Sequence, residues 1–209
     1  MRIESLKATA DRAGRYWVKF SDGSSLALYR QTVEDFGLYA GMELEEDEFS
    51  RLKEAAGQMS AKMRAVRIVS ASAVSKKDLQ QRLIQKGEDP EQAKQAVKWM
   101  ESLDLLDDRK TAEMVVQRCI TKGYGIARAK QALYEKKIPK SYWDDVLADY
   151  PDQTEMIADF LRARLGESWD DKDLKRAIDA ALRRGHSYSS IRRALNALQA
   201  GDDELPEEW

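Results

Sequence analysis

Residues 103–137 read LDLLDDRKTAEMVVQRCITKGYGIARAKQALYEKK, and this stretch decides how the chain folds. It opens with Asp107 and Asp108, whose carboxylates can accept hydrogen bonds from the free N–H groups of a helix start. Apolar residues then recur at helical spacing. Gly123-Tyr124-Gly125 ends this helix, because glycine adopts backbone angles that other residues resist. A second helix follows, so the stretch predicts two short amphipathic helices joined by a tight turn. The predicted buried stripe of the first helix consists of Ala112, Val115, Val116, Cys119 and Ile120.

The same pattern returns twice elsewhere in the chain. The segments LIQKG, LYEKK and ALRRG begin at Leu83, Leu133 and Ala181, which are offsets of 50 and 98 residues, and the fourth residue of each is basic. Beyond each segment, apolar residues spaced as i, i+4 and i+7 mark a third helix. A recurring apolar skeleton of this period is typical of stacked helical units. The apolar residues are Ala93, Val97 and Met100, then Trp143, Leu147 and Tyr150, and then Ile191, Leu195 and Leu198.

Three helices in each copy predict a mainly α fold of three tandem three-helix units. A unit of roughly 45 residues buries too little apolar surface to be secure alone. Neighbouring units should therefore share contacts, and we expect them to form a curved, elongated rod. The predicted helices are 59–72, 75–87 and 90–102, then 108–122, 126–137 and 140–150, and then 152–166, 171–184 and 187–198.

The first thirty residues differ from the rest and predict a small N-terminal β-hairpin-containing segment. Short strands are expected at 3–6, 15–20 and 24–29, with a hairpin loop at Ser21–Ser24, where Asp and Gly accept turn geometry. So small a sheet needs cover, which a short helical turn and an acidic helix over about 45–55 are expected to supply. The predicted segments of the chain are 1–57, 58–104, 105–150, 151–201 and an acidic tail at 202–209.

Charge is distributed unevenly along the sequence. The net charge is -2, yet residues 1–57 carry -3, residues 58–201 carry +6 and the tail carries -5. A single exposed Lys or Arg usually does no more than keep a protein in solution. An excess that recurs in all three units predicts instead a continuous basic surface that contacts phosphates or an acidic protein groove. The residues expected to line it are Arg64, Arg67, Lys76, Arg82, Lys86, Arg118, Lys122, Arg128, Lys130, Lys136, Arg183, Arg184, Arg192 and Arg193.

The sequence shows no pattern typical of catalysis or metal binding. Its one histidine, His186, is expected to be exposed in a loop, and its one cysteine, Cys119, to be a buried and inert thiol. We therefore expect a protein that is not an enzyme and needs no cofactor or metal. No apolar run approaches the ~20 residues of a membrane span, and the N-terminus lacks the apolar segment of a secretory signal. These features predict a cytoplasmic protein.

Three segments of the chain together resemble the RecX family of bacterial regulators of the RecA recombinase. They are Ser75–Gly87, Leu105–Asp108, and Lys122–Gly125 with the RAKQAL that follows. The order and spacing of the three carry the resemblance, which covers most of the helical region. The sequence departs from the family pattern at Thr111, where an aromatic residue is usual, and at Ile126, where proline or arginine is frequent.

The resemblance implies a regulator that binds within the groove of the RecA filament. Such a protein modulates, mainly by inhibition, the ATPase activity of RecA, filament extension and strand exchange, and has no chemistry of its own. The expected partners are the RecA filament and single- or double-stranded DNA, bound directly or through RecA. We expect a monomer with no membrane contact.

Two other functions fit the same sequence. Paired short helices with basic faces suit a stand-alone DNA-binding module, whose affinity for DNA would fall steeply with salt. A structural adaptor would instead use the acidic N-terminal helix and the acidic tail.

Overall fold

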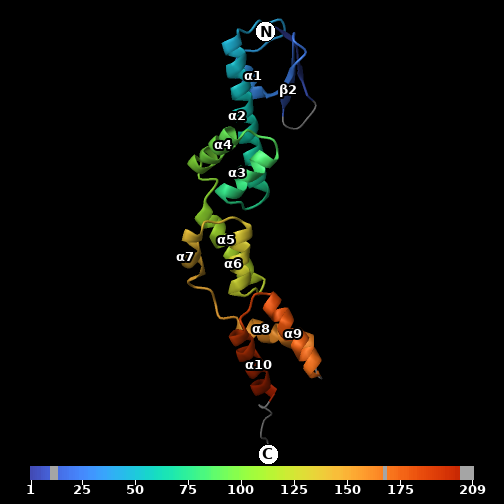
Figure 1. Cartoon of the computed structure of the whole chain (residues 1–209), viewed down its shortest axis with the longest axis vertical. Helices are drawn as coiled ribbons and strands as arrows, with labels where there is room; N and C mark the ends of the chain where they lie inside the picture. Colours follow the sequence, from blue (N-terminus) through green and yellow to red (C-terminus); the bar gives the residue numbers. More distant parts are fainter. Residues whose placement is uncertain (10–13, 167–168, 203–209) are drawn as a thin grey trace, which may run out of the picture. The chain divides into compact units, whose positions relative to one another are not determined.

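The structure is a computed structural model that describes residues 1–9, 14–166 and 169–202. The chain divides into two compact units, Met1–Asp107 and Asp108–Trp209, and each is described by itself. The fold is mainly helical with a small N-terminal antiparallel sheet, as the sequence predicts. Figure 1 shows the order of the elements along the chain.

The sheet of the first unit consists of three antiparallel strands in the order β1-β2-β3. Along β2, Val18 and Phe20 are buried while Trp17 and Lys19 are exposed, because successive side chains of a strand point to opposite faces. In the hairpin loop, the Asp22 carboxylate accepts a hydrogen bond from the Ser24 backbone N–H at 2.9 Å. The predicted hairpin is confirmed. The strands are β1 (Ile3–Ala8), β2 (Arg15–Phe20) and β3 (Ser25–Tyr29).

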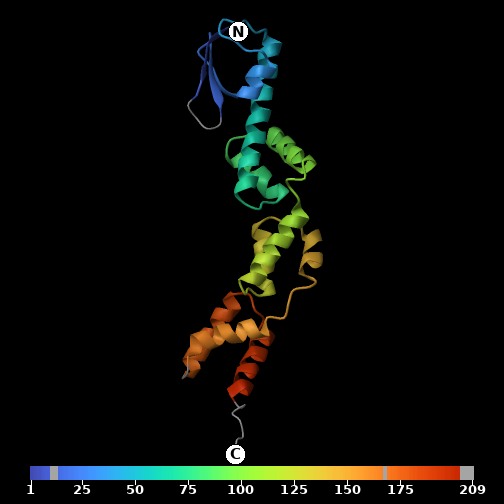
Figure 2. The ribbon, with the colours of Figure 1, turned by 180° about the vertical axis from the view of Figure 1, so that it is seen from behind.

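One long helix, α2 (Glu46–Ala71), follows the short helix α1 (Arg30–Asp35) and serves both the sheet and the first three-helix unit. The predicted split into an acidic helix near 45–55 and a second helix over 59–72 is wrong. A capping box between Glu45 and Glu48 starts the helix, and no proline interrupts it. Gly57 alone costs only about 1 kcal/mol in a helix. The two views in Figures 1 and 2 show the sheet beside the first half of α2, and α3 and α4 beside its second half.

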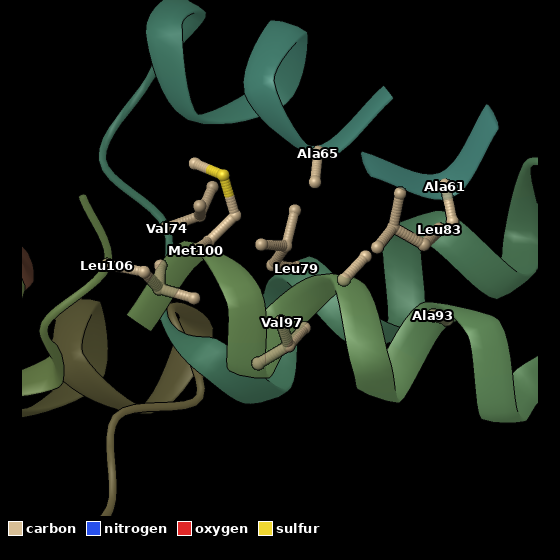
Figure 3. Packing of buried hydrophobic residues seen from close by; sticks show 10 residues of the cluster. Ala61, Ala65, Val74, Leu79, Leu83, Ala93, Val97, Met100 and Leu106 are labelled. Carbon is tan, nitrogen blue, oxygen red and sulfur yellow. The ribbon is translucent and has the colours of Figure 1, made fainter. Parts of the chain in front are cut away.

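The first three-helix unit closes around small residues of α2. Ala61 and Ala65 are fully buried and let the other two helices approach closely, as Figure 3 shows. Ser75 caps α3 by accepting a hydrogen bond from the Asp78 N–H at 3.1 Å, and Asp89 caps α4 in the same way. The helices are α3 (Lys76–Gln85) and α4 (Pro90–Ser102). The core residues that they and their connections supply are Val74, Leu79, Leu83, Ala93, Ala96, Val97, Met100 and Leu106.

The second three-helix unit departs from the prediction in its last element. A single helix over 140–150 was expected, but the structure has a 3₁₀ turn followed by a five-residue helix. Aromatic side chains occupy this part of the core and tie it down: the Trp143 indole donates to the Ile138 carbonyl at 3.2 Å, and the Tyr150 hydroxyl donates to the Tyr124 carbonyl at 2.5 Å. The elements are α5 (Asp108–Thr121), α6 (Ile126–Glu135), η1 (Lys140–Tyr142) and α7 (Trp143–Leu147).

The third three-helix unit matches the predicted pattern more closely. Asp170 caps α9 by accepting from the Asp173 N–H at 2.8 Å, and the Ser187 hydroxyl accepts from the Ser190 N–H at 3.1 Å at the start of α10. Its core includes Ile191 with Leu195 and Leu198, so the repeated apolar positions lie in the core here as well. The predicted loop 166–171 and acidic tail lie partly outside the described residues. The helices are α8 (Thr154–Leu165), α9 (Asp171–Arg183) and α10 (Tyr188–Asp202).

Candidate functional site

The second helix of each unit ends in the same kind of turn. The predicted basic residue is the C-cap in every case, and the residue after it has a positive φ between 56° and 89°. The N–H of this left-handed residue donates to the carbonyl three residues earlier at 2.8 to 2.9 Å, and the next N–H donates to the carbonyl five residues earlier at 3.0 to 3.3 Å. This pattern satisfies carbonyls that a helix end leaves free. The C-caps are Lys86, Lys136 and Arg184, followed by Gly87, Lys137 and Gly185.

The residue after each turn is buried, whatever its chemistry. The three equivalent residues are Glu88, Ile138 and His186, each less than 9% exposed. The prediction that His186 is an exposed loop residue is therefore wrong, because the turn directs its side chain back into the protein. Histidine in a short polar segment gives no sign of this, and only the alignment with Glu88 and Ile138 carries the information.

His186 is held by the preceding three-helix unit. Its Nε2 lies 3.0 Å from the carbonyl oxygen of Gly123, so the neutral ring donates a hydrogen bond there. Burial lowers the pKa of His186, and the positive charge of Arg184 lowers it further. The hydrogen bond to Gly123 acts in the opposite direction. The ring is therefore a neutral structural donor.

Glu88 plays a comparable part inside the first three-helix unit. Its carboxylate accepts a hydrogen bond from the Ser60 hydroxyl at 3.0 Å and forms an ion pair with Arg64 at 2.8 Å. Arg64 also donates to the carbonyl of Lys86. Arg64 was predicted to line the basic surface, but these contacts tie its guanidinium to the turn between α3 and α4.

The second and third units meet through glycines. The Gly125 N–H donates to the Arg184 carbonyl at 2.9 Å, and the Ala127 N–H donates to the Gly185 carbonyl at 3.3 Å. Free N–H groups at the start of α6 thus meet carbonyls just beyond the end of α9, an arrangement that also aligns the two helix dipoles favourably. A Cβ atom on Gly125 would lie 2.0 Å from the Gly185 oxygen. The sequence predicts a turn at Gly123-Tyr124-Gly125, but it does not reveal that Gly125 is also required for this close approach.

Arg184 belongs to the same junction. Its guanidinium donates to the Lys122 carbonyl at 2.5 Å and lies 5.1 Å from the ring centre of Tyr124 and 4.8 Å from that of Phe160. These contacts combine a hydrogen bond with two cation–π interactions. Arg184 therefore joins two three-helix units, a role that its place in the predicted basic surface does not suggest.

The structure sorts the fourteen predicted basic residues into two groups. Members of the first group have partners elsewhere in the fold: Arg82 pairs with Asp78 at 2.8 Å, and Arg193 pairs with Asp152 at 3.0 Å. Such residues hold the fold and offer less to a partner. Lys136, half-buried at its C-cap position, belongs with them. The group consists of Arg64, Lys76, Arg82, Arg128, Lys136, Arg184 and Arg193.

The second group, which we call the exposed cations, has exposed side chains with no ion pair among the described residues. Arg118 and Lys122 lie one turn apart at the end of α5, and the charges of both, together with Arg128, act on the buried thiol of Cys119. Burial raises the pKa of that thiol, and the three cations oppose this rise. They therefore lie near one another, around Cys119 in the second three-helix unit. The exposed cations are Arg67, Lys86, Arg118, Lys122, Lys130, Arg183 and Arg192.

The described residues offer little for other kinds of site. Within them, no group of three or more His, Cys, Asp or Glu side chains could hold a metal ion. None of the helices found there has the length and apolar character needed to cross a membrane.

Comparisons with known proteins show which proteins this chain resembles. No protein-family model matches the chain. The regulatory protein RecX of Clostridioides difficile is 26% identical over 208 residues, which cover 97% of this chain and 96% of that protein. The regulatory protein RecX of Xanthomonas campestris pv. campestris is 32% identical over 123 residues, which cover 57% of this chain and 76% of that protein.

Solved structures give the same picture of the fold. A crystal structure of regulatory protein RecX superimposes with a TM-score of 0.64 and 19% identity, covering 93% of this chain and 98% of that one. The crystal structure of RecX from Lactobacillus salivarius gives a TM-score of 0.60 and 21% identity, covering 70% of this chain and 99% of that one.

Proposed function

Because the chain belongs to the RecX family of regulatory proteins, we propose that it binds the RecA–DNA filament and inhibits ATP hydrolysis, filament extension and strand exchange by RecA. It acts by binding alone, as a monomer and without a cofactor. The family resemblance names RecA as the partner. The observation that carries the proposal is the set of exposed cations, which remain available after the fold has used the other predicted basic residues.

The exposed cations of the second three-helix unit are the strongest candidates for contact with the filament. Arg118 and Lys122 lie at the end of α5, and Lys130 lies on α6, all with exposed side chains. A DNA phosphate or a carboxylate of RecA would bind such a group favourably. Arg128 is a poorer choice, since it pairs with Glu135 at 3.2 Å and its backbone lies against Gly185.

The test is RecA-dependent ATP hydrolysis on single-stranded DNA, measured with increasing amounts of this protein. We expect the wild-type chain to inhibit hydrolysis. The triple variant Arg118→Glu, Lys122→Glu, Lys130→Glu should raise the half-inhibitory concentration by at least about tenfold, because each exposed ion pair contributes up to ~1 kcal/mol and reversal adds repulsion.

A matched control separates local contact from total charge. Lys98, Lys140 and Lys172 are also exposed and lie outside the predicted surface. Changing these three to Glu alters the net charge by the same amount and should leave inhibition almost unchanged. Equal loss in both triple variants would refute a local contact, and a wild-type chain with no effect on RecA would refute the proposed function itself.

A stand-alone DNA-binding module stays the alternative, because the exposed cations also suit phosphates without RecA. It predicts affinity for DNA alone, with log K falling by about 0.7 per log unit of salt for each phosphate contact on a single strand. Fluorescence anisotropy of labelled DNA over a salt series decides between the two: binding that RecA does not strengthen favours the module.

A further inference from the structure

An exposed apolar side chain stands at the same position in all three helical units. Ile84 is 39% exposed, Tyr134 71% and Leu182 40%. They align at the offsets of 50 and 98 residues that relate the units. Single exposed apolar residues are ordinary on protein surfaces. What sets these three apart from the other exposed apolar residues of the described chain is that they occupy the same position in all three units.

The backbone fixes these three side chains in the same way. The carbonyl of each accepts a hydrogen bond from the left-handed residue of the turn at 2.8 to 2.9 Å. The residue just before each is fully buried, so the helix is anchored to its own core at that point. Each unit therefore holds its apolar side chain outward on a rigid helix end. The buried neighbours are Leu83, Leu133 and Ala181.

An exposed cation lies close in sequence to each of these side chains. Lys86 is two residues after Ile84, Lys130 is four residues before Tyr134, and Arg183 follows Leu182 directly. A spacing of four residues places Lys130 and Tyr134 on one face of α6, whereas spacings of one or two residues do not bring two side chains of a helix together. In the second three-helix unit, the complementary surface is therefore an apolar hollow bordered by a carboxylate.

We propose that Ile84, Tyr134 and Leu182 are anchor residues, each of which docks a three-helix unit onto one copy of a repeating protein partner. This inference rests on the proposed function, in which that partner is RecA in its filament. Three equivalent sites on one chain suit a surface that itself repeats.

The chemistry of the anchors selects protein over nucleic acid. Proteins that bind single strands stack bases on aromatic rings, but two of the three anchors are aliphatic. Ile and Leu instead fill apolar hollows, and one such side chain contributes on the order of tenfold or more in affinity when it is fully buried. The anchors therefore contact RecA, while exposed cations away from the anchors remain available for phosphates.

The test replaces the anchors by glutamine, which has a high helix propensity and suits an exposed helical position. The variants are Ile84→Gln, Tyr134→Gln and Leu182→Gln, singly and together, and circular dichroism in urea checks that they fold. Affinity is measured with labelled chain on RecA filaments assembled on single-stranded DNA. Each single change should weaken binding by about fivefold to tenfold and the triple change by at least about a hundredfold.

The matched control changes one exposed apolar residue per unit away from the repeated position, namely Met63, Met114 and Tyr188. This triple glutamine variant should bind within about twofold of the wild type. If it loses as much as the anchor variant, or if the anchor variant binds normally, the inference is overturned. Equal loss of DNA binding without RecA would overturn it too. These outcomes all require a wild-type chain that binds filaments, whereas a wild-type chain that does not bind them contradicts the proposed function.

Discussion

The turn after α3 and the turn after α9 have the same backbone but different neighbours. Gly87 and Gly185 have φ values of 89° and 87°, and both follow a basic C-cap. A Cβ atom on Gly87 would meet nothing within 4 Å. On Gly185 it would lie 2.4 Å from the backbone nitrogen of Arg128, which belongs to the preceding three-helix unit.

The comparison shows that one repeated turn has two uses. In the first three-helix unit, the turn packs against a helix of the same unit, because Glu88 pairs with Arg64 and Ser60 of α2. In the third three-helix unit, the same turn contacts the second three-helix unit through Gly185 and His186. Glycine is therefore needed for backbone conformation alone in one place, and for conformation and close approach in the other.

The largest expected effect is that of alanine at the two equivalent glycines. Gly87→Ala should lower the free energy of unfolding by about 1 kcal/mol, since a left-handed residue with a Cβ costs roughly that amount. Gly185→Ala has the same backbone cost and an overlap with Arg128 as well, and should lose about 2–3 kcal/mol more. Hydrogen exchange of the α6 and α9 amides measures the loss where it occurs.

Gly125→Ala provides the control for that interpretation. Gly125 has a φ of -72°, which any residue adopts, so only the 2.0 Å overlap with the Gly185 oxygen remains. It should weaken protection of α6 and α9 by a similar 2–3 kcal/mol. Equal, small effects of all three substitutions would show that the two turns do not differ as described.

A smaller effect should distinguish the turns through pH. Burial lowers the folded-state pKa of His186 below that of the unfolded chain, about 6.5. The unfolded chain therefore takes up the proton first, and stability is lost as the pH falls from about 6.5 towards the folded-state pKa. The slope has an upper limit of about 1.4 kcal/mol per pH unit.

His186→Gln tests this sign, because glutamine keeps an N–H donor for the Gly123 carbonyl and does not titrate. His186 is the chain's one histidine. Urea unfolding between pH 7.5 and 5.5 should show a decline in the wild type and an almost flat profile in the variant. A decline of equal slope in both would assign the pH dependence to other groups.

The sequence predicts the repeat well because its signals are local. Helical spacing, the Ser75 and Asp89 caps and the Asp22-Gly23 loop each act within a few residues. The prediction failed where tertiary contacts decide. Gly57 suggests the end of a helix, but α2 continues through it, because the residues before and after Gly57 pack into two hydrophobic cores. The burial of His186 and the contacts of Arg184 depend on residues about 60 positions away, which no local pattern indicates.

The smallest effect concerns the middle copy of the turn, where Lys137 stands in place of glycine with a φ of 56°. A non-glycine residue in this conformation is strained. Lys137→Gly should therefore raise the free energy of unfolding by about 0.5–1 kcal/mol, after subtraction of the entropy that glycine loses on folding. Lys136→Gly is the control, because its φ of -82° already suits any residue, so glycine there relieves no strain and adds entropy to the unfolded chain. Urea midpoints that rise for Lys137→Gly and fall for Lys136→Gly would show that the left-handed position, rather than the loss of a lysine, sets the stability of the turn.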